Sequence, residues 1–287
     1  MSLRTRRRLV PWLFLAPALL WLLLFFAYPL LNQASVSLMT GDPENGYTLT
    51  WAFHTYWDAI SQYKVQFGRS ILYAGIATAL CLIIAFPLAY FTAFHAGRFR
   101  NLILLLIILP FFMSFVLRTV AWQLILADDG RVVSILRSIG VLGSDGRLLA
   151  SGVAVVAGIT YNFLPFMALP LYVALEKIDR RLLEAATDLY ASRATAFRKV
   201  TLPLALPGIF AGSLLTFIPA CGDFINAALL GTPRQYMIGN VIQSKFLNIL
   251  DYPTAAALSF TLMLFILIGI LLYARLLGAR NLTEAAI

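Results

Sequence analysis

Residues 70–94 read SILYAGIATALCLIIAFPLAYFTAF, and no charged side chain interrupts the run between Arg69 and Arg98. A helix of about 20 apolar residues is long enough to cross the hydrocarbon layer of a bilayer, which is ~30 Å thick. The rest of the chain has the same character, because 61% of its 287 residues are hydrophobic and only 12% are charged. This composition lies far from that of a water-soluble domain. The sequence therefore predicts a protein that folds within a lipid bilayer.

Further runs of comparable length recur along the chain. They lack the two-residue alternation of barrel strands, and backbone groups in lipid must be satisfied within the segment, so each run is expected to be a helix. We predict an all-α, polytopic membrane protein with six transmembrane helices in a single transmembrane domain, residues 1–287. The predicted spans are residues 10–38, 70–94, 101–126, 151–175, 204–230 and 254–276.

The distribution of Lys and Arg predicts the orientation of these spans. An even number of spans places both termini on one side, and that side holds 14 of the 22 basic residues, including Arg4, Arg6, Arg7 and Arg8. Because the cytoplasmic loops of membrane proteins carry the excess of Lys and Arg, we predict that both termini are cytoplasmic. The net charge of +9 then reflects topology and does not call for a nucleic-acid partner. The first run is too long for a signal-peptide core and is expected to stay uncleaved.

Motifs of soluble enzymes are missing from the sequence. It contains no G-x-x-x-x-G-K-[ST] phosphate loop, and with only His54 and His95 it has no H-E-x-x-H metal helix. Cys81 and Cys221 lie in different predicted spans, so a disulfide framework or a CxxC site is not expected. We predict that the chain is not an enzyme and binds no metal or cofactor of its own. Any use of ATP must come from a partner.

Two charged residues lie inside predicted spans, Arg118 and Asp223. A charge at the centre of a bilayer costs at least about 2.5–3.5 kcal/mol, so each of them needs a partner. Asp223 belongs to FIPACGDFINAALLG, residues 217–231, in which Pro219 and Gly222 favour a local break of the helix around a polar pathway. Asn226 follows on the same helical face.

Three interpretations of Asp223 remain open: an ion pair with Arg118, a contact with a transported substrate, or an exposed position near the outer mouth. TYNFLPF, residues 160–166, adds side chains that can donate hydrogen bonds or form a cation–π wall. Trp122, near Arg118, either lines the pathway or packs between helices. The candidate substrate pathway consists of Asp223, Asn226, Tyr161, Asn162, Phe163 and Trp122.

The most charged segment, LLEAATDLYASRATAFRKVTLP at residues 182–203, lies between the fourth and fifth predicted spans. Its apolar residues recur at helical spacing, and charged residues that include Glu184 and Asp188 form a polar face. The pattern predicts a short amphipathic helix, a turn near Ala191–Ser192, and a second short helix that ends at Pro203. The pattern alone is equally compatible with a connector that lies on the membrane surface.

The residues of this segment closely resemble the cytoplasmic EAA loop of binding-protein-dependent ABC importer permeases. The motif of that family is EAA, three residues, Gly, nine residues, Ile, one residue and Leu-Pro. Val200 stands at the Ile position, and Tyr190 stands at the Gly position. The remaining motif positions match at Glu184, Ala185, Ala186, Leu202 and Pro203.

Tyr190 is the one departure that bears on the conformation of the loop. A Gly allows a positive φ angle, which is costly for Tyr. We therefore expect either that the turn takes another route or that the Tyr ring itself contacts the ATPase.

The resemblance implies a type I ABC importer permease fold with cytoplasmic coupling helices at residues 180–200. It extends to PWLFLAPALLWLLLFFAYPL (11–30), YNFLPFMALPLY (161–172) and MIGNVIQSKFLNILDYPTAAALSFTLML (237–264), which look most like spermidine/putrescine permease subunits. The implied ATPase-coupling residues are Glu184, Ala185, Ala186, Asp188, Tyr190, Leu202 and Pro203. The implied partners are a second similar permease, an ABC ATPase dimer that binds ATP and Mg, and an extracytoplasmic solute-binding protein. The implied location is the bacterial cytoplasmic (inner) membrane.

Transport of a small solute by alternating access is the function that these expectations share. A carboxylate and aromatic rings beside a polar break suit the ammonium groups of a polyamine. The alternative is a stand-alone secondary transporter or channel that uses Asp223 as an ion or proton site, and the EAA-like segment argues against it. An intramembrane enzyme is disfavoured, because no metal ligands or nucleophile–base pair are present.

Overall fold

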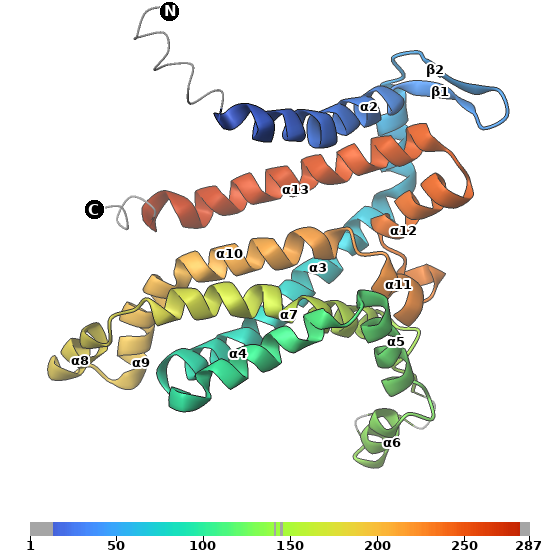
Figure 1. Cartoon of the computed structure of the whole chain (residues 1–287). Helices are drawn as coiled ribbons and strands as arrows, with labels where there is room; N and C mark the ends of the chain where they lie inside the picture. The colour runs from blue at the N-terminus through green and yellow to red at the C-terminus, as the bar shows by residue number, and fades with distance from the viewer. Residues whose placement is uncertain (1–13, 141, 144–145, 282–287) are drawn as a thin grey trace, which may run out of the picture. The chain divides into compact units, whose positions relative to one another are not determined.

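The structure is a computed structural model that describes residues 14–140, 142–143 and 146–281, the side chains of 276–281 excepted. Its regular structure is helical apart from one two-stranded hairpin in the described part of the chain (Figure 1). The chain divides into two compact units, Met1–Gln62 with Ile242–Met263, and Tyr63–Val241 with Leu264–Ile287. The arginines at positions 4, 6, 7 and 8 and the first four residues of the first predicted span lie outside the described residues.

The first unit begins with the helix Phe14–Val36, which contains a π-helical turn, η1, at Leu23–Ala27 and ends as α2, Tyr28–Val36. An antiparallel hairpin follows, in which Met39 of β1 pairs with Leu49 of β2. Its turn is closed by the Asp42 carboxylate, which accepts hydrogen bonds from the backbone N–H groups of Glu44 and Asn45. The hairpin strands are β1 (Met39–Asp42) and β2 (Gly46–Leu49), and the unit also holds η6 (Ser244–Asn248) and the first parts of α3 (His54–Phe94) and α13 (Tyr252–Asn281).

The second unit contains the remaining elements and the greater part of α3. The boundary between the units falls in α3 at Tyr63, the residue at which the backbone of this helix leaves helical geometry (φ −109°, ψ 18°). The complete elements of this unit are η2 (Gly97–Phe99), α4 (Arg100–Ile108), η3 (Leu109–Phe112), α5 (Phe115–Ile125), α6 (Arg131–Ser138), α7 (Gly152–Glu176), α8 (Arg180–Asp188), α9 (Arg193–Ala196), η4 (Phe197–Thr201), α10 (Leu202–Cys221), α11 (Ile225–Leu230) and η5 (Pro233–Gln235). It also holds the first four residues of α12 (Ile238–Gln243) and the last part of α13.

Five helices in the described part of the chain are long and apolar enough to cross a membrane. They are Phe14–Val36, His54–Phe94, Gly152–Glu176, Arg193–Cys221 and Tyr252–Arg275. A sixth candidate exists only if the bent pair Gly97–Phe112 and Phe115–Ile125 is counted as one span.

The third predicted span, 101–126, is therefore not one continuous helix. Its two halves meet at an angle of 97°. Pro110 removes one helical donor, and Met113 then takes an extended conformation (φ −96°, ψ 146°) that ends the first half.

The fifth predicted span, 204–230, also differs from the structure at both ends. The helix starts at Arg193 and ends at Cys221, and α11 is a separate short helix. The predicted stop at Pro203 is wrong, because the chain passes through the π-helical turn η4 straight into α10. In that turn the N–H of Leu202 bonds to the carbonyl of Phe197, so the hydrogen-bond pattern shifts by one residue just before the proline, which has no donor to offer.

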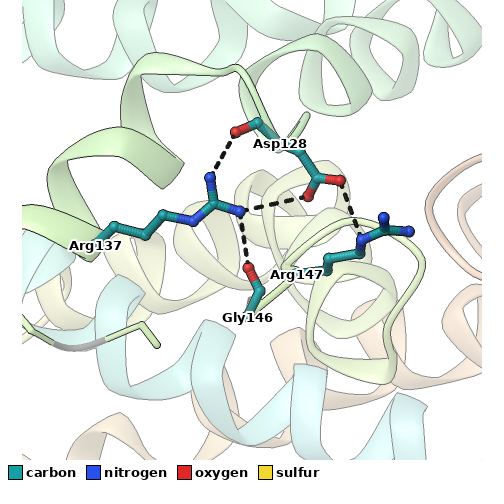
Figure 2. A network of polar contacts seen from close by, with 4 residues as sticks. All are labelled: Asp128, Arg137, Gly146 and Arg147. Atoms are coloured by element: carbon teal, nitrogen blue, oxygen red, sulfur yellow. Dashed lines mark hydrogen bonds and ion pairs between the residues drawn. The ribbon is translucent and has the colours of Figure 1, made fainter. Parts of the chain in front are cut away.

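A loop with its own polar network joins α5 to α7 and carries α6 (Figure 2). Arg137 donates to the backbone carbonyl of Asp128 (3.1 Å) and to that of Gly146 (3.1 Å). The Asp128 carboxylate lies 3.2 Å from Nε of Arg147. These contacts fix the start and the end of the loop against each other.

Small and large apolar residues together form the core of the second unit, where α3, α7 and α10 meet. A Cβ atom on Gly212 of α10 would lie 2.8 Å from Sδ and 3.0 Å from the backbone oxygen of Met167 in α7, and one on Gly208 would lie 2.5 Å from Cβ of Ala174. The Gly-x-x-x-Gly spacing lets the backbones of α7 and α10 approach closely, which is how helices associate in lipid. The buried cluster consists of Cys81, Ala85, Ala89, Met167, Ala168, Leu171, Tyr172, Leu175, Ile178, Ala205 and Ile209.

We predict that Gly212→Ala destabilises the protein by about 1–3 kcal/mol, because the added methyl group pushes against the α7 backbone. The matched control is Gly75→Ala, since a Cβ atom at Gly75 meets nothing within 4 Å. The unfolding temperature of the detergent-solubilised protein should be lower for Gly212→Ala, and unchanged or higher for the control. Equal shifts for the two variants would contradict the close contact between α7 and α10.

Candidate functional site

The break between α10 and α11 is held by a carboxylate. Oδ1 of Asp223 accepts the backbone N–H of Asn226 at 2.8 Å, and Oδ2 accepts the side-chain amide of Asn226 at 2.6 Å. Asp223 is only 6% exposed. Proline and glycine end α10, as the sequence predicted, and the Asp side chain supplies the acceptor that the first turn of α11 needs.

Asn226 is the centre of a buried hydrogen-bond network that joins three helices. Its Oδ1 accepts the amide of Asn162 in α7 at 3.1 Å and the hydroxyl of Thr119 in α5 at 3.3 Å. Asn162 also donates to the Thr119 hydroxyl at 3.2 Å. Oδ1 of Asn162 has no hydrogen-bond partner in the described part of the chain. The network thus fixes the position of α11 and leaves one buried acceptor unused.

Three residues that sequence reasoning missed support this arrangement. Gly158 of α7 lets α11 approach, because a Cβ atom there would lie 2.6 Å from Oδ1 of Asn226. Gly239 of α12 sits directly against the backbone carbonyl of Gly222 in the break. Asn240 donates to the carbonyl of Phe224 at 2.8 Å and satisfies a backbone group that the break frees. The sequence signal was a glycine one turn before Asn162 and a Gly-Asn pair, and neither is specific by itself.

A cavity of about 210 Å³ lies against the break. Asp223 and Phe163 both line it, together with Phe115, so two of the six predicted pathway residues share one space. Asn226 and Asn162 lie in the network behind Asp223. Trp122 and Tyr161 pack against each other, with ring centroids 5.5 Å apart. The structure thus divides the predicted set into a carboxylate cluster and an aromatic pair.

Of the three interpretations of Asp223, the ion pair with Arg118 is not present in the structure. Asn226 occupies both oxygens of the carboxylate, and the guanidinium lies instead 5.5 Å from the ring centres of Phe111 and Phe115. Arg118 is 6% exposed, and its Nε and Nη1 have no hydrogen-bond partner among the described residues. The burial of Asp223 also opposes an exposed position at the outer mouth. A substrate contact of Asp223 stays a prediction.

Double-mutant cycles should separate the two possible partners of Asp223. We expect Asp223→Asn and Asn226→Ala to be coupled by about 0.5–3 kcal/mol in unfolding free energy, because the two side chains share hydrogen bonds. The matched cycle of Asp223→Asn with Arg118→Gln should give a coupling below about 0.5 kcal/mol. Thermal or denaturant unfolding in detergent measures both. A larger coupling in the Arg118 cycle would restore the ion pair.

The EAA-like segment forms a helix–turn–helix at the end of the second unit where α7 ends and α10 begins (Figure 1). Asp179 caps α8 by accepting the N–H of Arg181 at 3.0 Å, and Ser192 caps α9 by accepting that of Thr195 at 3.2 Å. The predicted turn near Ala191–Ser192 is present between the two helices. Among the predicted coupling residues, Glu184, Ala185, Asp188, Tyr190 and Pro203 are exposed, and Ala186 and Leu202 are half-buried.

Tyr190 keeps the conformation that a glycine would take. Its φ angle is +58°. The N–H of Tyr190 bonds to the carbonyl of Thr187, and that of Ala191 bonds to the carbonyl of Ala186, which together form a Schellman motif. The expected alternative route of the turn is therefore not found. A left-handed conformation at a non-glycine residue costs on the order of 1 kcal/mol or more, and the motif holds it in place.

The base of this segment is attached to α3. The Phe197 ring lies 5.6 Å from that of Phe86 and 6.2 Å from that of Tyr90, measured between centroids. Arg180 donates to the carbonyls of Ala93 and Phe94 at the end of α3. These contacts anchor the segment to α3, one of the three helices that form the core.

A bundle of apolar helices with a buried polar break and an exposed EAA-type loop has the features of a membrane permease. Residues 85–279 match the family model described as the binding-protein-dependent transport system inner membrane component, and the chain belongs to this family. It is a multi-pass membrane protein.

Curated relatives cover nearly the whole chain. The chain is 38% identical over 256 residues to the spermidine/putrescine transport system permease protein PotB of Haemophilus influenzae, covering 89% of this chain and 90% of the relative. It is 37% identical over 256 residues to the protein of the same name from Escherichia coli K12, covering 89% and 93%.

Solved structures share the fold. A chain from the crystal structure of a bacterial ABC transporter involved in the import of the acidic polysaccharide alginate matches with a TM-score of 0.68 and 20% identity, covering 94% of this chain and 96% of that chain. A second structure, of a bacterial alginate ABC transporter with an alginate pentasaccharide-bound periplasmic protein, matches with the same TM-score over 97% and 96%. At this identity the likeness concerns the fold.

Proposed function

We propose that the chain is a transmembrane permease subunit of an ATP-driven ABC importer for polyamines such as spermidine and putrescine. The observation that carries the proposal is the 38% identity to a spermidine/putrescine permease along 89% of the chain, together with the EAA-type loop. In this proposal the chain has six spans in a type I importer architecture, both termini are cytoplasmic, and it lies in the bacterial inner membrane. The bent pair of α4 and α5 counts as one of the six spans.

The partners are proposed from the same resemblance. A second similar permease completes the pathway, an ABC ATPase dimer binds ATP and Mg, and an extracytoplasmic solute-binding protein delivers the substrate. The solved alginate transporter with its periplasmic protein supports an arrangement of this kind, since its chain has this fold. The permease itself hydrolyses nothing. Its part is to change conformation when the ATPase closes.

The route of that change runs through the exposed loop. α8 and α9 connect α7 to α10, and both of these helices pack in the core with α3. A movement of the loop therefore reaches the α10–α11 break, at the other end of α10, where Asp223 and Phe163 line the cavity. We propose that this break borders the pathway and that Asp223 pairs with an ammonium group while the rings of Phe163 and Phe115 form cation–π contacts.

A direct test uses the complete transporter in proteoliposomes with ATP supplied on the ATPase side. We expect uptake of labelled spermidine, competition by unlabelled putrescine, and no uptake when the ATPase is omitted. Asp223→Asn should lower uptake at limiting substrate by about tenfold or more, because a hydrogen bond to a charged group is lost. Glu44→Gln on the exposed hairpin is the control and should have no effect.

Two outcomes would contradict different parts of this proposal. Full uptake without the ATPase would contradict the proposal of an ABC importer and would favour a stand-alone transporter that uses Asp223 as an ion site. Unchanged uptake by Asp223→Asn would remove only the substrate contact.

Labelling of introduced cysteines tests the orientation. The native Cys81 and Cys221 are fully buried, so background reaction with a membrane-impermeant maleimide should be low. Glu184→Cys should react only from the cytoplasmic side, in inverted vesicles, and Glu44→Cys only from the outside, in intact spheroplasts. The reverse pattern would place the loop outside the cell, where an ATPase has no access to it.

A further inference from the structure

The side chain of Tyr190 is 99% exposed. It makes no aromatic, cation–π or hydrogen-bond contact through its ring with the described part of the chain, and Leu189 beside it is 81% exposed. Two large apolar side chains thus stand free at the tip of the turn between α8 and α9. No contact within the described residues accounts for them.

The backbone at this position is unfavourable as well. Tyr190 is one of four non-glycine residues with positive φ among the described residues, with Trp51, Ala150 and Leu250. Trp51 is 62% exposed and Leu250 is 39% exposed, so Tyr190 is the most exposed of the three large side chains. A glycine would remove the strain of the positive φ angle, and no buried apolar surface would be lost, because the Tyr ring is exposed. The free chain therefore gains nothing from tyrosine at this position.

The charge beside the ring is also placed unfavourably for the free chain. Asp188 is the last residue of α8, where the partial negative charge of the helix end disfavours a carboxylate. It makes no ion pair in the described part of the chain. The tip of the loop therefore presents an exposed carboxylate followed by two exposed apolar side chains.

We propose that the Tyr190 ring is the anchor of the contact between this permease and its ATPase subunit, and that it inserts into an apolar pocket with a Lys or Arg on its rim facing Asp188. The proposal rests on the proposed function and names the residue that decides the strength of that contact. Aromatic anchors that fill a pocket contribute a large share of the binding energy of an interface. The Schellman hydrogen bonds hold the turn in advance, so little order has to be gained when the ring is bound.

The test separates the ring from the backbone. Tyr190→Ala removes the ring and keeps the positive φ strain, Tyr190→Gly removes both, and Tyr190→Phe keeps the ring. Trp51→Gly is the matched control, because it removes an exposed aromatic residue with φ of 53° outside the loop. Two quantities are measured: the unfolding temperature of the permease pair purified without ATPase, and its dissociation constant for the cognate ATPase subunit in nanodiscs.

The two measurements should move independently. Without ATPase, Tyr190→Gly should unfold about 1–4 °C above Tyr190→Ala, because the strain is relieved. The dissociation constant should rise at least about tenfold for both variants, and should stay within about twofold of the unchanged protein for Tyr190→Phe and Trp51→Gly. Asp188→Asn should weaken binding less than loss of the ring does, and its effect should fade at high salt.

Three results would overturn the anchor. The first is wild-type affinity of Tyr190→Gly, because the ring would then be dispensable. The second is an equal loss of affinity in Trp51→Gly. The third is the absence of any binding between the unchanged permease pair and the ATPase. This third result would also contradict the proposed function, whereas the first two contradict only the role of the Tyr190 ring.

Discussion

The two hydrogen bonds from Asn226 to Asp223 hold the break on which the architecture of the site depends. A helix that is interrupted within a bilayer cannot pass its freed backbone groups to water. Here the carboxylate accepts the N–H of the next helix, and Asn240 donates to a carbonyl that the break leaves over. The Thr119 hydroxyl of α5 and the Asn162 amide of α7 both donate to the same asparagine. A cavity can therefore exist beside a broken helix without leaving the helix ends unsatisfied.

Much of the fold follows from the sequence, because a charge-free run that is long enough to cross the bilayer predicts a spanning helix. The predicted span 151–175 differs from α7, Gly152–Glu176, by one residue at each end. Local composition predicts the start of a helix less well where the helix contains polar and aromatic residues. The helix α3 starts at His54, well before the predicted span at 70, since a more polar helical segment joins the apolar one across the kink at Tyr63. The 97° bend in the third span depends on packing that no short window contains.

The outline of the site follows from the sequence, whereas the partner of Asp223 stays open there between Arg118, a substrate and an exposed position. Proline, glycine and an acidic residue in one apolar run predict the break between α10 and α11. The helical spacing from Asp223 identifies Asn226 as part of the site. The ion pair with Arg118 is one of these three interpretations, because two buried charges of opposite sign stabilise each other. In the structure an amide three residues away reaches the carboxylate instead, with far less loss of chain entropy. At Tyr190 the sequence indicates the cost of a positive φ angle correctly. The turn nevertheless keeps this angle, because the Schellman hydrogen bonds hold it.

The attachment of the loop to α3 has a mechanical consequence. Arg180 grips the end of that helix, Phe197 lies against its side, and the two ends of the loop continue into α7 and α10. A force on the loop therefore acts on three helices at once, and the close contacts of Gly208 and Gly212 with α7 leave little room for α10 to slide along α7. In the proposed transport cycle, a displacement of the loop therefore moves α3, α7 and α10 together instead of bending one helix alone.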